Sequence, residues 1–206
     1  MIADIANYIS THSAQLGTQI TAHIGISLFA LIVAVVIGVP CGYFASKSAK
    51  SEAMVTAPFE ILRVVPSLAL FALLIPVTGL GRTTAVIVLT LYNQYILLRS
   101  FTAGLRDVDP AVCEAAKGIG MTDMQILTKI RVPLARRAIF AGIRLAVVST
   151  IGIGTIAASI NAGGLGTLLF EGLRTINTPK ILWGSVLSAL LAVSINRLLK
   201  MVEERL

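Results

Sequence analysis

Long apolar runs alternate with short polar stretches along the chain. Two of these runs, Ile24–Ser46 and Leu145–Phe170, contain no Asp, Glu, Lys or Arg. Each is longer than the roughly 20 residues that an α-helix needs to cross a bilayer. Five apolar segments can be drawn, with ends that Pro and Gly blur: residues 20–46, 54–78, 83–105, 134–160 and 181–200. The pattern therefore predicts an all-α membrane protein with about five transmembrane helices, in a single domain spanning residues 1–206.

The prolines predict that some of these spans are bent. The second segment contains Pro58, Pro66 and Pro76, and the first ends in the cluster Gly38–Gly42 around a further proline. Proline removes a backbone donor and kinks a helix, and the carbonyls freed in this way must face protein or water rather than lipid. A transport path and ordinary helix packing in a bundle are both compatible with such bends.

The composition excludes an ordinary soluble domain. Hydrophobic residues make up 56% of the chain and charged residues only 13%, whereas a soluble domain has about a quarter charged residues. The net charge of +7 could suggest nucleic acid, but the basic residues lie between the apolar segments, so we expect a lipid bilayer and no nucleic acid as partner. The chain has no phosphate-binding P-loop and no HExxH metal pair, so we expect no cofactor, no metal and no enzymatic activity of its own.

Basic residues gather on one side of the predicted spans. That side comprises the first connection, the connection after the third span and the C-terminal tail. It holds the following basic residues: Lys47, Lys50, Arg106, Lys117, Lys129, Arg131, Arg136, Arg137, Arg197, Lys200 and Arg205. The other side holds only Arg82, Arg174 and Lys180. Because cytoplasmic loops are enriched in Lys and Arg, we expect the N-terminus outside and the C-terminus in the cytoplasm.

The cytoplasmic connection between spans three and four, residues 109–133, contains signals for two short helices. Asp109–Pro110 supplies a capping oxygen and a proline at the first helical position, and Gly118 and Gly120 are natural helix stops. Thr122–Gln125 then has the spacing of a capping box. We expect a second helix to begin there and to end before Pro133.

The connection also has more apolar side chains than a simple linker needs. They are Val112, Ala115, Ala116, Ile119, Met121, Met124, Ile126 and Leu127. An apolar face exposed to the cytoplasm would promote aggregation unless a partner covers it. The residues alone leave three alternatives: a partner protein covers this face, the segment folds back on its own bundle, or the segment lies on the membrane.

Six residues in this connection resemble the EAA motif of ATP-binding-cassette (ABC) importer permeases: Glu114, Ala115, Ala116, Gly120, Ile130 and Pro133. The motif ends in Ile-x-Leu-Pro, and Val132 replaces its Leu. The resemblance implies a type I ABC importer-like fold and makes residues 109–133 the coupling segment, seated in a groove of a cytoplasmic ATPase subunit.

Further stretches resemble the permeases of osmoprotectant importers for glycine betaine, carnitine and choline. These are Val65–Leu70, Leu74–Gly81, Ala141–Leu145 and Ile160–Gly166. Leu91–Ile96 departs from the family, because it lacks the proline usual there. The resemblance implies uptake of quaternary ammonium solutes, and a different small zwitterionic or amino-acid-like substrate is the alternative.

The resemblance also implies partners and a location. ATP and Mg²⁺ belong to ATPase subunits, an extracytoplasmic binding protein delivers the substrate, and a second permease, identical or sister, completes a pair in the bacterial cytoplasmic membrane. The expected mechanism is alternating access. A passive channel is one rival function, and an intramembrane enzyme is another, although His12 and His23 are expected outside or at the edge of the first span and offer no catalytic apparatus.

Charged and polar residues within the predicted spans are candidates for a translocation path or gate. They are Glu60, Arg63, Pro66, Tyr92, Asn93, Arg144 and Asn161. Charges inside a membrane are costly and tend to face a bundle interior or an aqueous cavity. We therefore expect Glu60 to pair with Arg63 or Arg144 near the cytoplasmic gate, although an ion pair that only holds helices together is the simpler alternative.

The uncharged candidates leave similar alternatives. The amide and phenol groups of the third span either line a path or bond across helices; they belong to Tyr92, Asn93, Gln94 and Tyr95. The Gly-rich turn Asn161–Gly166 suits an extracellular gate, a contact for the binding protein or close helix packing.

Overall fold

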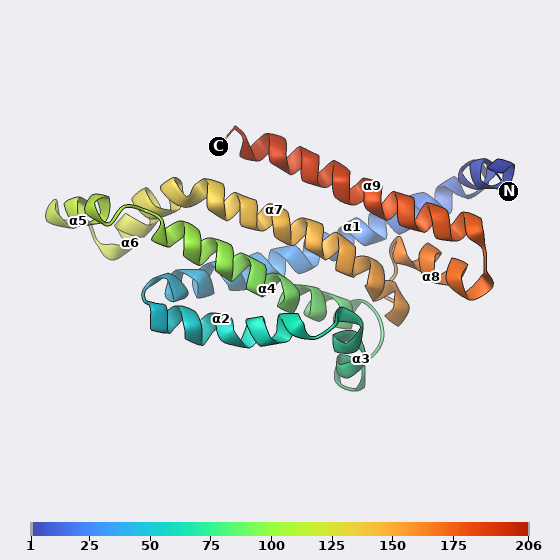
Figure 1. Ribbon diagram of the computed structural model, residues 1–206, viewed down its shortest axis with the longest axis horizontal. Helices are drawn as coiled ribbons and strands as arrows, with labels where there is room; N and C mark the ends of the chain where they lie inside the picture. Colours follow the sequence, from blue (N-terminus) through green and yellow to red (C-terminus); the bar gives the residue numbers. More distant parts are fainter. Residues whose placement is uncertain (1, 206) are drawn as a thin grey trace.

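The computed structural model describes residues 2–205, with side chains from Asn7 onward. The described part of the chain is helical throughout and contains no strand. Four long helices lie along one axis as a bundle (Figure 1): α1 (Ile2–Ser46), α4 (Arg82–Arg106), α7 (Val132–Ala157) and α9 (Thr178–Glu203). The shorter elements are α2 (Ala49–Val64), α3 (Ser67–Thr78), α5 (Pro110–Gly118), α6 (Asp123–Ile126), a π-helical turn (Leu127–Arg131), a 3-10 turn (Ala158–Ile160) and α8 (Gly166–Thr175).

The shorter helices lie at the two ends of the bundle. Helices α5 and α6 project from one end, which is also the end where α9 and the chain terminate, and α8 lies near the opposite end beside the start of α1 (Figure 1). Helix α2 runs along α4, and α3 turns away from it. The two termini of the described chain therefore lie at opposite ends of the long axis.

Helix α4 is the centre of the fold. It packs against α1, α2, α3 and α7, and its apolar residues Val88, Leu89, Leu97 and Leu98 are fully buried. Burial on several sides lets this helix carry polar side chains that lipid would not tolerate. Helix α4 is consequently the least hydrophobic of the four long helices.

Length and apolar character alone identify fewer spans than the sequence pattern does. In the described chain, three helical stretches are long and apolar enough to cross a membrane: Asn7–Ser46, Asp123–Ile160 and Thr178–Glu203. A fourth is obtained if the bent pair α2 and α3 counts as one span. Helix α4 is not among them, because its Thr, Asn, Gln and Tyr side chains lower its hydropathy.

Only one of the prolines breaks a helix. The helix direction bends by 103° between α2 and α3. Val65, just before Pro66, is extended with φ −67° and ψ 127°, because a following proline disfavours the helical conformation. Pro58 and Pro76 lie inside helices. Helix α1 likewise continues through Pro40 and ends at Ser46, the predicted end of the first segment.

Helix α8 was not predicted, and close contacts at glycines hold it in place. The turn that precedes it has Asn161 at φ 62° and both Gly163 and Gly164 at φ 86°, in the left-handed region that glycine accepts without strain. A Cβ atom at Gly184 of α9 would lie 2.7 Å from the Leu169 backbone nitrogen of α8. The two helices therefore pack backbone against backbone.

Candidate functional site

The connection 109–133 begins with a capped helix, as predicted. The Asp109 carboxylate accepts a hydrogen bond from the Ala111 backbone N–H at 2.8 Å, and a proline occupies the first helical position. At the other end, Gly120 has φ 87° and the Met121 N–H donates to the Ala116 carbonyl at 3.0 Å. The left-handed glycine closes the helix, and α5 is fixed at both ends.

The capping box of the second helix is also confirmed. The Thr122 hydroxyl accepts from the Gln125 backbone N–H at 3.3 Å, and the Gln125 side-chain oxygen accepts from the Thr122 backbone N–H at 2.8 Å. These two bonds satisfy donors that a helix start leaves free. The turn between α5 and α6 is thus only a few residues long and held on both sides.

The prediction that the second helix ends before Pro133 was wrong. Helix α6 continues through the π-helical turn Leu127–Arg131 directly into α7, and the Val132 N–H donates to the Leu127 carbonyl, five residues back. Proline cannot donate a backbone hydrogen bond and crowds the carbonyl four residues earlier. The wider π turn places Pro133 in the first turn of α7, where a missing donor is tolerated.

The apolar side chains of the connection divide into a buried set and an exposed set. Cys113, Ala116 and Ile126 are buried in a cluster with residues from the end of α4 and the start of α7. The exposed set comprises Val112 at 42%, Ile119 at 81% and Met124 at 59% exposure. The segment thus folds back on its own bundle with one face and leaves a second apolar face uncovered.

The motif residues follow the same division. Glu114, Ala115, Gly120 and Pro133 are exposed. Ala116 is buried, and the half-buried Ile130 packs against the same cluster. Four of the six motif residues therefore remain accessible to another protein.

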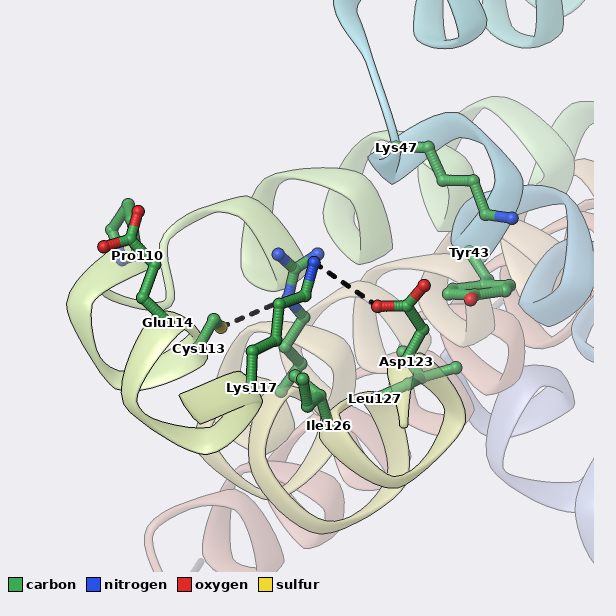
Figure 2. A pocket seen from close by; sticks show the side chains of 10 residues that line it. Tyr43, Lys47, Pro110, Cys113, Glu114, Lys117, Asp123, Ile126 and Leu127 are labelled. Carbon is green, nitrogen blue, oxygen red and sulfur yellow. Dashed lines mark hydrogen bonds and ion pairs between the residues drawn. The ribbon is translucent and has the colours of Figure 1, made fainter. Parts of the chain in front are cut away.

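A cavity of about 420 Å³ lies between this segment and the end of α1. Its charged lining consists of Lys47, Glu114, Lys117, Asp123 and Arg131. Figure 2 labels four of these side chains, Lys47, Glu114, Lys117 and Asp123. It also shows Tyr43, whose ring centroid lies 4.8 Å from the Lys47 Nζ. The Arg131 Nε donates to the Cys113 Sγ at 3.5 Å. Residues of α1, α5 and α6 thus line the cavity together.

The expected pairing of Glu60 with Arg63 or Arg144 was wrong. The Arg144 guanidinium instead donates to the Glu203 carboxylate at 2.7 Å and to the Asn196 side-chain oxygen at 2.9 Å, so it joins α7 to α9. Glu60 is exposed and forms no ion pair with any residue that the structure describes. Helix α9 reaches Arg144 because it runs back along α7 and ends beside it.

The remaining candidates on α2 contact α4. Arg63 lies over the Tyr95 ring, with its Cζ 4.7 Å from the ring centroid. The Tyr92 hydroxyl donates to the Val65 carbonyl at the bend, next to the exposed Pro66. The carbonyl of Val65, next to the proline bend, is thereby satisfied by a side chain of α4.

Asn93 lies in the middle of the bundle, on the other side of α4. Its Nδ2 donates to the Thr150 hydroxyl of α7 at 2.6 Å, and Gln94 Nε2 donates to the Ala34 carbonyl of α1 at 3.0 Å. Asn93 and Gln94 are each 1% exposed. These amides bond across helices, and their side-chain oxygens have no hydrogen-bond partner in the described chain.

Asn161 lies in the outer turn, apart from the other candidates. It is exposed, whereas the neighbouring Ala162 and Gly164 are buried. Gly164 lies against His23, and a Cβ atom there would be 2.8 Å from the His23 Nδ1. His23 is buried inside the bundle next to this outer turn, and its Nε2 donates to the Ile151 carbonyl at 3.1 Å.

Comparison with known proteins identifies the family. The family described as "Binding-protein-dependent transport system inner membrane component" matches residues 34–206. The chain belongs to this family. It is therefore a permease subunit of an ABC importer, and the resemblance seen in its sequence is confirmed.

Curated relatives match this permease over nearly its whole length. It is 34% identical to the choline transport system permease protein OpuBB of Bacillus subtilis and 35% identical to the carnitine transport permease protein OpuCB of Listeria monocytogenes, each over 98% of this chain and 93% of the relative. It is 34% identical to the osmoprotectant import permease protein OsmW of Salmonella typhimurium, over 95% of this chain and 94% of that protein.

Solved structures share the fold of the permease. A chain of the MetNI methionine ABC transporter in an inward-facing conformation superposes with a TM-score of 0.86 at 21% identity, covering 95% of this permease and 97% of that chain. An amino acid ABC transporter solved with histidines gives a TM-score of 0.80 at 18% identity, covering 96% and 97%. The all-helical fold is thus that of ABC transporter membrane chains.

Several contacts of the permease were not foreseen from its sequence. Thr150 and Glu203 are the partners of Asn93 and Arg144, and Arg106 contacts both α1 and α2. The sequence gives no spacing signal for these pairs, because their members are more than 50 residues apart. Arg106 was noted only as one of many basic residues on the cytoplasmic side.

Proposed function

We propose that this permease takes up quaternary ammonium osmoprotectants such as glycine betaine, carnitine and choline by alternating access. The names of the relatives support this substrate class, since they carry choline, carnitine or osmoprotectants. The alternative is another small zwitterionic or amino-acid-like solute, as the folds shared with methionine and amino acid transporters would allow.

The connection 109–133 is the proposed coupling segment within one transmembrane domain of residues 1–206. The observation that carries this proposal is the apolar face left uncovered beside the motif, formed by Val112, Ile119 and Met124. A cytoplasmic ATPase subunit, which binds ATP and Mg²⁺, would cover this face and push on α5. The caps at Asp109 and Thr122 keep the helices folded under that load.

The proposed membrane arrangement has five spans. Helices α1, α4, α7 and α9 and the bent pair α2 and α3 each cross once, with α4 shielded from lipid by its neighbours. The cluster of basic residues around α5, α6 and the C-terminus supports a cytoplasmic location for this end, with the N-terminus outside. The opposite position of the two termini in the bundle agrees with an odd number of spans (Figure 1).

A second permease, identical or sister, is proposed to face α2 and α3. Ile61, Val64 and Val77 on these helices are 72%, 75% and 82% exposed. Glu60 also lies on α2, and its carboxylate has no ion-pair partner among the described residues. A carboxylate facing lipid alone would be costly. We therefore propose that Glu60, Arg63, Pro66 and the neighbouring Tyr92 border a water-accessible path between two permeases.

The remaining candidates have more distant roles in this proposal. Asn161 belongs to an outer gate that meets the substrate-binding protein. Asn93 and Arg144 keep α4, α7 and α9 in register beside the path.

The docking proposal is tested by substituting Ile119, the residue that caps the C-terminus of α5 and the most exposed apolar residue of this region. Ile119→Asp places a charge on the proposed ATPase-facing surface, and we expect the permease to lose copurification with its ATPase. Ile176→Asp is the matched control, because Ile176 is 87% exposed at the opposite end of the bundle. Equal recovery of the ATPase with both variants would exclude this face as the docking surface.

A further inference from the structure

Arg106 joins three helix ends beside the connection 109–133. It is the last residue of α4, three positions before the Asp109 cap of α5. Its Nη1 donates to the Glu52 carboxylate, its Nη2 to the Ala45 carbonyl at 3.3 Å and its Nε to the Ser46 carbonyl at 3.4 Å. One side chain thereby ties the end of α4 to the end of α1 and to the start of α2.

The chemistry of the acceptors explains why an arginine suits this position. Ala45 and Ser46 are the last residues of α1, where helix carbonyls lack partners within the helix and carry partial negative charge. Glu52 lies in the first turn of α2. The guanidinium presents several donors in a fixed planar fork, whereas a lysine ammonium is a single point charge. Each nitrogen of Arg106 therefore serves a different acceptor.

Helix α2 is fastened to α4 at its other end as well. There the Tyr92 hydroxyl donates to the Val65 carbonyl, and Arg63 lies over the Tyr95 ring. Both attachments come from α4. Helix α2 is thus held at its start and at its bend by the helix that leads directly into α5.

We propose that Arg106 is the positioning residue that transmits movement of the coupling segment to α2, the helix bearing Glu60 and Arg63. The inference rests on the proposed function, since it takes residues 109–133 to be the segment that the ATPase moves. Only Asp107 and Val108 separate Arg106 from the α5 cap, so a displacement of α5 reaches Arg106 with little slack. Through Glu52 and the α1 carbonyls it then shifts the inner ends of α1 and α2 together.

The experiment compares two matched ion pairs in the complete complex of permease, ATPase and binding protein, reconstituted in liposomes. The side chains of the Arg106–Glu52 pair are 33% and 26% exposed. The Lys180–Glu171 pair at the opposite end has side chains 25% and 31% exposed and a separation of 3.2 Å. The variants are Arg106→Gln, Arg106→Lys and, as control, Lys180→Gln, and the readout is the amount of glycine betaine, carnitine or choline imported per ATP hydrolysed.

A transmission role predicts that Arg106→Gln lowers solute imported per ATP by roughly fivefold or more, the lower range of coupling between sites. Arg106→Lys should recover part of this ratio because it keeps the charge but not the fork, and Lys180→Gln should leave the ratio unchanged. The proposal is overturned if Arg106→Gln leaves the amount of solute imported per ATP unchanged. This includes the case in which uptake and ATP hydrolysis fall in equal proportion.

Import by the unsubstituted complex separates this proposal from the proposed function, and assembly of each variant is measured as well. Failure of the unsubstituted complex to import any of the three solutes would count against the proposed function, not against Arg106. If Arg106→Gln does not assemble, the Arg106→Lys variant decides. If the Arg106→Lys complex assembles and imports the unsubstituted amount of solute per ATP, the proposal is overturned, because the guanidinium fork is then not needed. A lowered amount of solute per ATP supports the proposal.

Discussion

The Arg144 guanidinium on α7 binds the Glu203 carboxylate at the end of α9, with a distance of 2.7 Å between the Nε and an oxygen. The same side chain donates to Asn196, two turns earlier on α9. Because α7 continues directly from the connection 109–133, this contact holds the C-terminal helix to the helix that leads out of the proposed coupling segment.

Arg144→Leu should destabilise the permease by about 1–3 kcal/mol, because it leaves the partly buried Glu203 carboxylate without its donor. The midpoint of thermal unfolding in detergent measures the effect. Lys200→Gln is the control, since its pair with Glu204 is exposed at both side chains and such pairs contribute at most about 1 kcal/mol. Equal midpoints for the two variants would show that the Arg144 contact does not stabilise the bundle.

Glu114→Lys and Gly120→Asp should uncouple ATP hydrolysis from uptake while the spans still insert. The first reverses a charge on the exposed face of α5, and the second puts a side chain at a φ of 87°, where most residues are strained. Solute imported per ATP in liposomes is the measurement, and Glu204→Lys supplies the same charge change in the exposed tail. Normal transport by both the Glu114→Lys and the Gly120→Asp variants would refute the assignment of the coupling segment.

Asn93 and Thr150 should show a favourable interaction energy in a double-mutant cycle. Hydrogen bonds between transmembrane helices average about 0.6 kcal/mol and reach about 1.7 kcal/mol, and the 2.6 Å contact between these two residues is expected within that range. The cycle uses Asn93→Leu and Thr150→Val, with unfolding in detergent as the measurement. A coupling energy of zero would mean that Asn93 does not hold α4 to α7.

Gly166→Ala should be among the most destabilising small substitutions, with a cost of about 3 kcal/mol or more from overpacking. A Cβ atom at Gly166 would overlap the Thr155 carbonyl oxygen and lie 2.8 Å from the Ala158 Cβ. Gly152→Ala is the matched control, because no atom lies within 4 Å of the Cβ that it adds. The yield and thermal midpoint of folded protein compare the two, and similar values would contradict the close packing of the outer turn.

The sequence predicted the helical class, the caps of the connection and a bend in the second apolar segment, because each depends on neighbouring residues. The hydrogen bonds that the Asp109 carboxylate and the Thr122 hydroxyl accept reach only two or three positions along the chain. The continuation of α6 through the π turn into α7 was not predicted. A π turn that accommodates Pro133 depends on how α6 and α7 pack. Helix α8 was missed as well, because glycines normally indicate loops, whereas Gly166 and Gly172 here permit close packing.

The candidate site was predicted less completely than the fold. The motif from Glu114 to Pro133 identified the connection, but the sequence left open which of its apolar residues are buried. The partner of Arg144 could not be predicted, since only the return of α9 along α7 brings Glu203 to it. Because Arg144 pairs with Glu203 instead, Glu60 lacks the partner that was expected for it within the described chain.

We propose that this chain is the permease of an ATP-driven importer of quaternary ammonium solutes. The direct measurement is uptake of labelled glycine betaine, carnitine and choline into liposomes that hold the permease, its ATPase and its binding protein, with ATP supplied on the ATPase side. We predict accumulation against a gradient of at least one of these solutes, dependent on both ATP and the binding protein. Equilibration that proceeds without ATP, or accumulation of none of the three solutes, would contradict the account.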